Sequence, residues 1–191
     1  EYQATIANKS YKVDKPFLVL ATQNPIEEEG AYKLPEAQLD RFMFKIIINY
    51  NTKEEELLIA RNVASNSFKP INSVVSFDEI IKIQNEILDI HMDKEIEQYI
   101  VNIIDATRYP KQYNLNHLEQ YLAFGASPRA TIDMFKASKA QAYLRNNNYV
   151  TPTDIALIAK DILRHRIILS YEAQADDIEE DYIIDQILQN V

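Results

Sequence analysis

The spacing of apolar residues changes partway along this chain, and that change is the strongest constraint on its fold. Two early segments, residues 17–22 and 43–48, are nearly continuous apolar runs. Runs of this kind are typical of strands that are covered on both faces of a parallel sheet. Further on, apolar residues recur with the period of one helix face, as in residues 80–90. We therefore predict an α/β remnant in residues 1–50 and an all-helical domain in residues 51–191.

Local signals place the elements within these two parts. Residues 2–6 and 11–13 are strand-like and flank a turn-prone stretch at residues 8–10, which predicts a hairpin. Pro35 can open a short helix that runs through Phe42. Further helices are predicted to open at Thr52, Ser76, Asp93, Ser127, Thr151 and Glu180.

The chain contains only two glycines, Gly30 and Gly125. A phosphate-binding loop of the G-x-x-x-x-G-K-[ST] type needs two closely spaced glycines, and a dinucleotide-binding turn needs three. The sequence therefore excludes both kinds of loop within this chain.

The sequence predicts no metal site. The chain has no cysteine, and its three histidines, His91, His117 and His165, lie far apart. Zinc sites need several such ligands at short, defined spacings. Each histidine therefore better fits a surface or packing role.

Charge is unevenly distributed along the chain. The formal net charge is −9, and residues 171–191 hold seven acidic side chains and no Lys or Arg. The other 170 residues carry 20 basic and 22 acidic groups, so a basic surface of the kind that binds polyanions is not expected. The sequence therefore argues against nucleic acid as a partner.

The chain also gives no sign of a membrane span or a targeting segment. No apolar run reaches the roughly 20 residues that a spanning helix needs, and the absence of cysteine fits a reducing compartment. We therefore expect no membrane span and a cytoplasmic protein. Because the first residue is Glu1 rather than Met, we also expect a piece of a longer protein.

Two polar residues follow predicted elements at places where they could meet a ligand. Asn24 comes just after the apolar run at 17–22, where α/β sheets bind ligands, and its amide can orient a water or contact a phosphate oxygen. It can equally serve only the turn before Pro25. Arg41 should face outward from a short helix and could reach a neighbouring phosphate site, or it could form an ordinary ion pair with Asp40 or Glu36.

Arg129 falls in the first turn of the helix that Ser127 and Pro128 open. The helix dipole disfavours a cation there by roughly 0.3–1 kcal/mol. An arginine at this position is explained if an anion docks on the same helix end. The alternative is that Arg129 turns away to a neighbouring carboxylate.

Four sequence blocks together resemble one family. Residues 17–25 (FLVLATQNP) followed by Gly30, residues 34–42 (LPEAQLDRF), residues 125–130 (GASPRA) and residues 163–167 (LRHRI) are similar to segments of the MoxR-type AAA+ ATPases, in the same order and at fitting separations. The combination is specific, although any single block is weak. The resemblance covers essentially the whole chain.

The resemblance implies roles for the three polar residues. Asn24 corresponds to sensor 1, which polarises the attacking water near the γ-phosphate. Arg41 corresponds to the arginine finger, supplied to the nucleotide of the adjacent subunit, and Arg129 corresponds to sensor 2, which contacts phosphate from the lid. Whether Arg129 acts on its own nucleotide or on a neighbour's stays open. The implied fold is the C-terminal part of a P-loop AAA+ core (1–50) followed by an all-α helical lid (51–191).

The resemblance also implies cofactors and partners. The full-length protein would use ATP and Mg²⁺, whereas this fragment lacks the phosphate loop and should be inactive and bind no cofactor tightly. It would form a homo-oligomeric ring, expected to be a hexamer, and act as a chaperone-like remodeller of a partner that carries a von Willebrand factor A domain.

Two other readings stay open at this stage. A magnesium-chelatase-type motor subunit shares the same architecture. A non-catalytic helical interaction module, with the acidic residues 171–191 as its docking surface, belongs to a different functional class.

Overall fold

The structure, a computed structural model, describes residues 3–23, 34–65, 67 and 70–191. The chain divides into two units, one made of Glu1–Ala21 with Ile46–Gln84 and the other of Thr22–Lys45 with Asn85–Val191. Residues 34–45 fall in the second of these units, and the predicted division into residues 1–50 and 51–191 stays a prediction.

The first unit contains the predicted hairpin. Strands β1 (Gln3–Ile6) and β2 (Lys9–Lys12) pair antiparallel. Ala7 and Asn8 have positive φ angles of 47° and 64°, so the turn lies slightly earlier than residues 8–10. The left-handed region is accessible to asparagine at little cost, which suits it to a tight hairpin turn.

Helices α2 (Lys53–Ala64) and α3 (Phe77–Leu88) begin where their capping residues predict. The backbone N–H of Thr52 donates to Glu55 Oε2 over 2.8 Å, and the N–H of Glu55 donates to Thr52 Oγ1 over 3.3 Å. Ser76 and Glu79 form the same reciprocal pair before α3. These pairs satisfy backbone donors that a helix start leaves unpaired.

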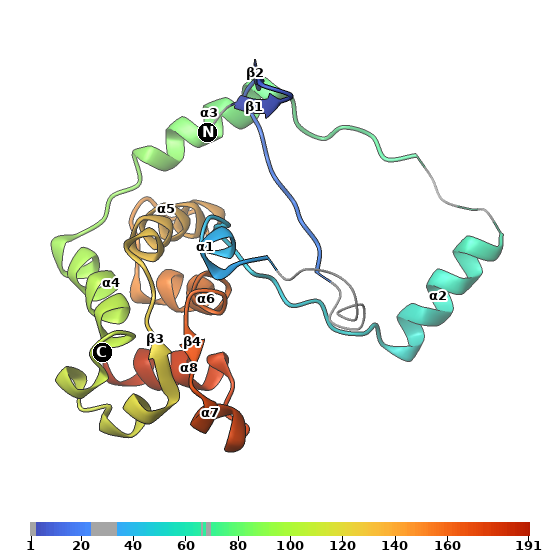
Figure 1. Cartoon of the computed structure of the whole chain (residues 1–191). Helices are drawn as coiled ribbons and strands as arrows, with labels where there is room; N and C mark the ends of the chain where they lie inside the picture. Colours follow the sequence, from blue (N-terminus) through green and yellow to red (C-terminus); the bar gives the residue numbers. More distant parts are fainter. Residues whose placement is uncertain (1–2, 24–33, 66, 68–69) are drawn as a thin grey trace. The chain divides into compact units, whose positions relative to one another are not determined.

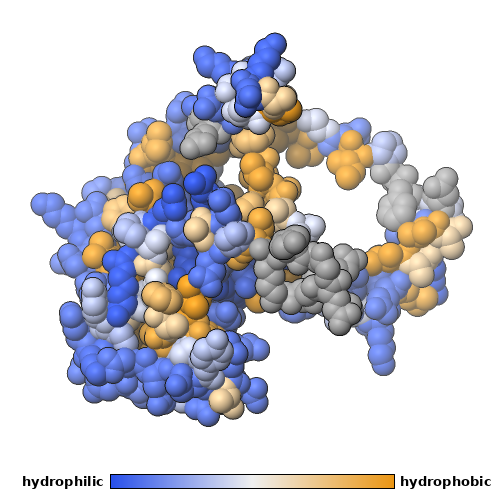
Figure 2. Space-filling view, in the orientation of Figure 1, coloured by the Kyte–Doolittle hydropathy of each residue, from blue (hydrophilic) through white to orange (hydrophobic). Residues whose placement is uncertain are grey.

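The predicted buried strands at 17–22 and 43–48 are not formed. The described residues of both runs have no strand partner, and Leu18, Leu20 and Ile48 are 77%, 84% and 89% exposed. Figure 2 shows apolar side chains on the surface after β2 and along α2. A parallel strand is completed only by neighbours that accept its hydrogen bonds and cover its faces, and no described segment does so here.

The second unit is built around a helical core. Helices α4 (Lys94–Ala106), α5 (Pro128–Leu144), α6 (Pro152–Leu163) and α8 (Glu180–Asn190) confirm the predicted helices. α5 packs against α4 and α6, and α6 packs against α8 (Figure 1). Their apolar stripes supply the fully buried side chains Ile100, Ile103, Ile104, Met134, Ile155, Ile162, Leu163, Ile183, Ile184 and Ile187.

Shorter elements link these helices. Strand β3 (Leu122–Phe124) pairs antiparallel with β4 (Ile168–Leu169), and α7 (Tyr171–Ala175) follows. The chain reaches β3 through the 3-10 turns η2 (Pro110–Tyr113) and η3 (Asn116–Tyr121), none of which the sequence pattern predicted. The short helix α1 (Glu36–Leu39) lies in this unit, as Figure 1 shows.

The acidic end of the chain takes part in internal packing. Lys160 donates to Asp185 over 2.8 Å, and Arg164 pairs with Asp181, while the isoleucines of α8 are buried. This part of the acidic segment is therefore engaged within the unit rather than presented as a free docking surface. Within the described residues, no helix is both long and apolar enough to cross a membrane.

Gly125 allows the loop before α5 to approach the end of α4. A Cβ at this position would lie 2.5 Å from the Thr107 carbonyl oxygen and 2.8 Å from Arg108 Cγ. The close approach is held by Ala126, whose N–H donates to Thr107 Oγ1 over 2.9 Å and whose carbonyl accepts from Arg108 Nε over 2.7 Å. This contact fixes where α5 begins.

We expect Gly125→Ala to destabilise the helical unit by about 1–3 kcal/mol, because the added methyl overlaps a backbone carbonyl that cannot retreat without breaking these bonds. Urea denaturation followed by circular dichroism measures the loss. Ala123→Ser adds one atom at an exposed position nearby and should change stability by less than about 0.5 kcal/mol. Equal stability of both variants would contradict the expectation.

Candidate functional site

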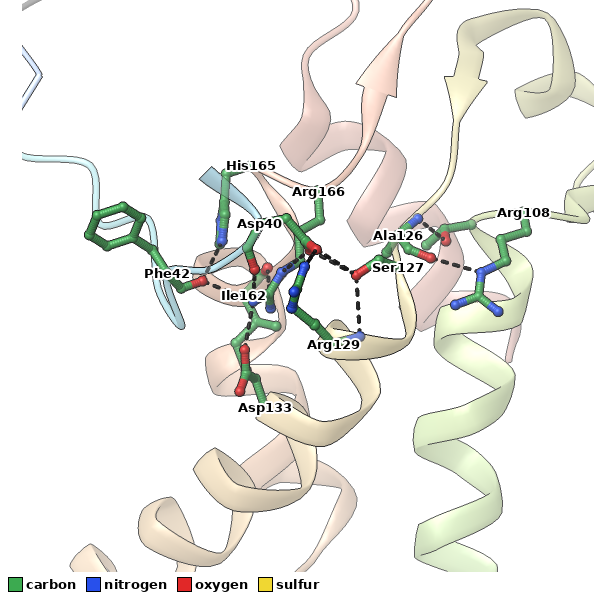
Figure 3. Close-up of polar contacts among 11 residues, drawn as sticks. Asp40, Phe42, Arg108, Ala126, Ser127, Arg129, Asp133, Ile162, His165 and Arg166 are labelled. Atoms are coloured by element: carbon green, nitrogen blue, oxygen red, sulfur yellow. Dashed lines mark hydrogen bonds and ion pairs between the residues drawn. The ribbon is translucent and has the colours of Figure 1, made fainter. Parts of the chain in front are cut away.

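The carboxylate of Asp40 is held at the N-terminal end of α5 (Figure 3). Arg129 Nη1 donates to Asp40 Oδ2 over 2.9 Å, and Ser127 Oγ donates to Asp40 Oδ1 over 2.8 Å. Arg166 Nε also donates to Asp40 Oδ1, over 3.1 Å. The positive end of a helix dipole and two guanidinium groups thus meet one carboxylate.

Local sequence explains how α5 presents this end. Ser127 is the N-cap, and its Oγ accepts from the backbone N–H of Arg129 over 3.2 Å while donating to Asp40. Pro128 occupies the first helical position, where its fixed φ is favourable and its missing N–H costs nothing. The side chain of Arg129 is half exposed at 54%, so part of its guanidinium remains accessible to solvent.

The side chain of Arg166, the third partner of Asp40, is fully buried. Its Nη2 donates to the carbonyl oxygens of Asp40 and Phe42, over 3.1 and 2.9 Å, and to Asp133 Oδ2 over 2.6 Å. Its Nη1 donates to the carbonyl oxygen of Ile162 over 3.3 Å. A buried guanidinium is stable only when its charge and its donors are matched in this way.

His165 and Asp161 hold the same segment from beside Arg166. His165 Nε2 is 2.9 Å from the Phe42 carbonyl oxygen, and this acceptor requires the proton on Nε2. The backbone N–H of Lys45 donates to the carbonyl oxygen of Asp161 over 2.7 Å. The segment after α1 is therefore fixed to the end of α6 through its backbone.

Electrostatics keep Asp40 ionised. Burial alone would raise the pKa of Asp40, but hydrogen bonds from Arg129 and Ser127 and the charge of Arg166 outweigh it and hold the pKa below its usual value. At neutral pH, two arginines are therefore balanced by Asp40 and Asp133.

The predicted site residues meet different outcomes. Arg41 is exposed, as predicted, and no described residue pairs with its guanidinium, while Asp40 is bonded to Arg129 and Arg166 instead. Arg129 meets a neighbouring carboxylate, and that carboxylate sits at the helix end where an anion was expected. Asn24 lies outside the described residues. The roles of all three stay predictions.

Five contributors to this cluster were missed from the sequence: Ser127 as a ligand, Asp40, Asp133, His165 and Arg166. A signal was available for all but Asp133, because Asp40 lies in residues 34–42, Ser127 in residues 125–130, and His165 and Arg166 in residues 163–167, which are blocks of the resemblance. What the sequence could not supply was the contact between these blocks.

Comparison with known proteins finds two families that match parts of this chain. The family described as "AAA lid domain" matches residues 116–187, and the one described as "ATPase family associated with various cellular activities (AAA)" matches residues 1–44. The protein named Chaperone MoxR1 of Mycobacterium tuberculosis is 38% identical over 191 residues, which cover all of this chain. The chain matches the C-terminal region of the MoxR-type AAA+ ATPases.

Other relatives extend this result. YeaC of Bacillus subtilis is 36% identical over 192 residues, and a solved structure, titled a putative ATPase from Cytophaga hutchinsonii, matches all of this chain with a TM-score of 0.93 and 46% identity. The chain spans about half the length of these proteins, 50% of Chaperone MoxR1, 57% of YeaC and 58% of the solved chain. The predicted fold class, a C-terminal remnant of an AAA+ core followed by a helical lid, is confirmed.

We expect the stability of this MoxR-type lid to fall as the pH drops below about 6.5. Burial, with smaller effects of Arg166 and Lys45, lowers the pKa of His165 despite its bond to Phe42. The unfolded chain therefore takes up this proton first, and the contribution of neutral His165 to stability, complete above the unfolded pKa, is lost on acidification.

Melting temperatures measured from pH 5.5 to 7.5 test this expectation. His165→Gln cannot titrate and should flatten the profile, whereas His117→Gln, at an exposed position, should leave it unchanged. The same acid sensitivity in His165→Gln would assign the effect to another group.

Proposed function

We propose that this chain is the part of an AAA+ ATPase subunit that senses the nucleotide and supplies an arginine finger. In the full-length protein it couples ATP hydrolysis to chaperone-like remodelling of partner proteins. The observation that carries the proposal is Arg41, an exposed guanidinium on a segment whose flanking carbonyls are both held by Arg166.

Arg41 suits the role of a finger in two respects. Its side chain is exposed, and among the described residues no ion pair has to be broken before its guanidinium binds a phosphate of an adjacent subunit. Its backbone follows a short helix, with its N–H donating to the Gln38 carbonyl oxygen over 3.2 Å. A finger of this kind neutralises charge that develops on the transferred phosphoryl group, and a fixed backbone limits the reorganisation needed.

Arg129 suits the role of sensor 2. It lies on the first turn of α5 beside backbone N–H groups, and its half-exposed guanidinium can donate to a phosphate oxygen. Asn24, in the role of sensor 1, would orient the attacking water through its amide. Whether Arg129 reads the nucleotide of its own subunit or of a neighbour stays open.

The residues of this chain fit ATP phosphates better than Mg²⁺. Arg41 and Arg129 offer anion-binding donors, whereas the described residues contain no cluster of three or more His, Asp or Glu side chains that could hold a metal ion. The phosphate loop and the Mg²⁺ ligands would come from outside this chain, and we infer that the chain alone does not hydrolyse ATP.

A finger that serves another subunit requires an oligomer. We therefore propose a homo-oligomeric ring. The resemblance to the MoxR-type ATPases implies that the ring is a hexamer and that its client carries a von Willebrand factor A domain, and we place it in the cytoplasm. The name of the relative Chaperone MoxR1 supports the chaperone-like part of this proposal.

We expect Arg41→Ala in the full-length protein to lower kcat for ATP by about 10³-fold or more and to leave the Kd for ATP nearly unchanged, because a finger contributes mainly in the transition state. Steady-state ATPase assays and equilibrium nucleotide binding measure the two effects. Arg61→Ala, at an exposed arginine on α2, serves as the control and should keep full turnover. Normal ATPase rates in Arg41→Ala would remove the finger assignment.

We expect Arg129→Ala to weaken ATP binding by about 10- to 100-fold, since charge-assisted hydrogen bonds contribute about 1.5–3 kcal/mol. Titration of the full-length protein with a non-hydrolysable ATP analogue provides the measurement. Lys136→Ala removes a positive charge from an exposed position of the same helix and controls for net charge. Equal affinities of the two variants would argue against sensor 2.

A further inference from the structure

The function proposed above gives the side chains of residues 163–167 no part in nucleotide binding or hydrolysis, yet Arg166 in this block makes several polar contacts in the site. Arg166 donates to the carbonyl oxygens of Asp40 and Phe42, the residues on either side of Arg41. It also donates to the Asp40 side chain. The backbone of the residue between them is thereby held on both sides by one buried guanidinium, as Figure 3 shows for the labelled residues.

Two further acceptors hold the guanidinium of Arg166 in place. Asp133 on α5 accepts from Nη2 over 2.6 Å, and the Ile162 carbonyl on α6 accepts from Nη1 over 3.3 Å. The guanidinium is rigid and planar, so donors fixed on one side fix the directions of the others. Through Arg166, the position of the segment that bears Arg41 therefore depends on the positions of α5 and α6.

Arg164, two residues earlier, provides a contrast. Its guanidinium bonds Asp161 on α6 and Asp181 on α8, which are both inside the helical bundle. Neither of these contacts reaches residues 40–42. Two arginines of one short block thus differ in what they hold: Arg164 joins helices to one another, and Arg166 joins them to the segment of Arg41.

We propose that Arg166 is a positioning residue for the arginine finger, setting where the Arg41 guanidinium stands when it meets the nucleotide of a neighbouring subunit. This inference rests on the proposed function of Arg41. Asp40 connects the two arginines, because its carboxylate binds Arg166 through Oδ1 and Arg129 through Oδ2. The backbone of the finger and the predicted sensor 2 are therefore attached to one side chain.

The expected signature is a loss of turnover without a loss of binding. Displacing a catalytic group by about an ångström can cost about 100-fold in rate. The side chain of Arg166 is fully buried and is not expected to contact the nucleotide itself. Its removal should therefore leave the Kd for ATP nearly unchanged.

The test is a double-mutant cycle in the full-length protein, read by single-turnover ATP hydrolysis so that slow variants remain measurable. Arg166→Met should lower the rate by about 10- to 100-fold and leave the Kd for a non-hydrolysable ATP analogue nearly unchanged. In the Arg41→Ala background, the same substitution should cause no further loss, because no finger remains to be positioned. Arg164→Met is the matched control, which should lower the melting temperature but keep the rate.

The outcomes separate the two proposals. If Arg41→Ala hydrolyses ATP normally, the finger assignment fails and the positioning role fails with it. If Arg41→Ala is slow but Arg166→Met lowers the rate by the same factor with and without Arg41, or does not lower it, the finger stands and the positioning role is overturned. Should Arg166→Met fail to fold, Arg166→Lys replaces it in the cycle, since it keeps the charge but cannot reach both carbonyls.

Discussion

The buried guanidinium of Arg166 is the interaction on which the arrangement of this site depends. Burying a cation is costly unless its charge is neutralised and its donors are satisfied. Here two carboxylates, Asp40 and Asp133, and three backbone carbonyls meet that requirement. Because these acceptors come from α5, α6 and the segment after α1, the hydrogen bonds of this one side chain hold three parts of the chain together.

The sequence predicted most of the helices because their signals are local. The reciprocal bonds between Thr52 and Glu55 lie within one turn, and the isoleucine stripes of α4 and α6 repeat within each helix. The strand predicted at residues 17–22 is not formed, and here the signal was not local. A buried strand forms only where neighbouring segments pair with it and cover its faces. An apolar run shows that the segment needs such neighbours, not that they are present.

The same distinction applies to the site. The outward direction of Arg41 could be predicted from the short helix that precedes it. The partner of Arg129 could not, because Asp40 is 89 positions away, and Arg166 is 126 positions from the same carboxylate. Nor did spacing indicate that Arg164 and Arg166 face different partners, since this depends on how the chain leaves α6.

Attachment of residues 40–45 to the helices has a mechanical consequence. The segment is bonded through a carboxylate, two carbonyls and the N–H of Lys45, so a rigid-body displacement of α5 and α6 carries the backbone of Arg41 with it. The half-exposed Arg129 stands on the same helix and shares Asp40 with Arg166. An anion that draws Arg129 away from Asp40 removes one of the two guanidinium partners of that carboxylate. Arg166 and Ser127 then remain as the partners of Asp40. A contact at the end of α5 and the placement of Arg41 are in this way coupled through a single carboxylate.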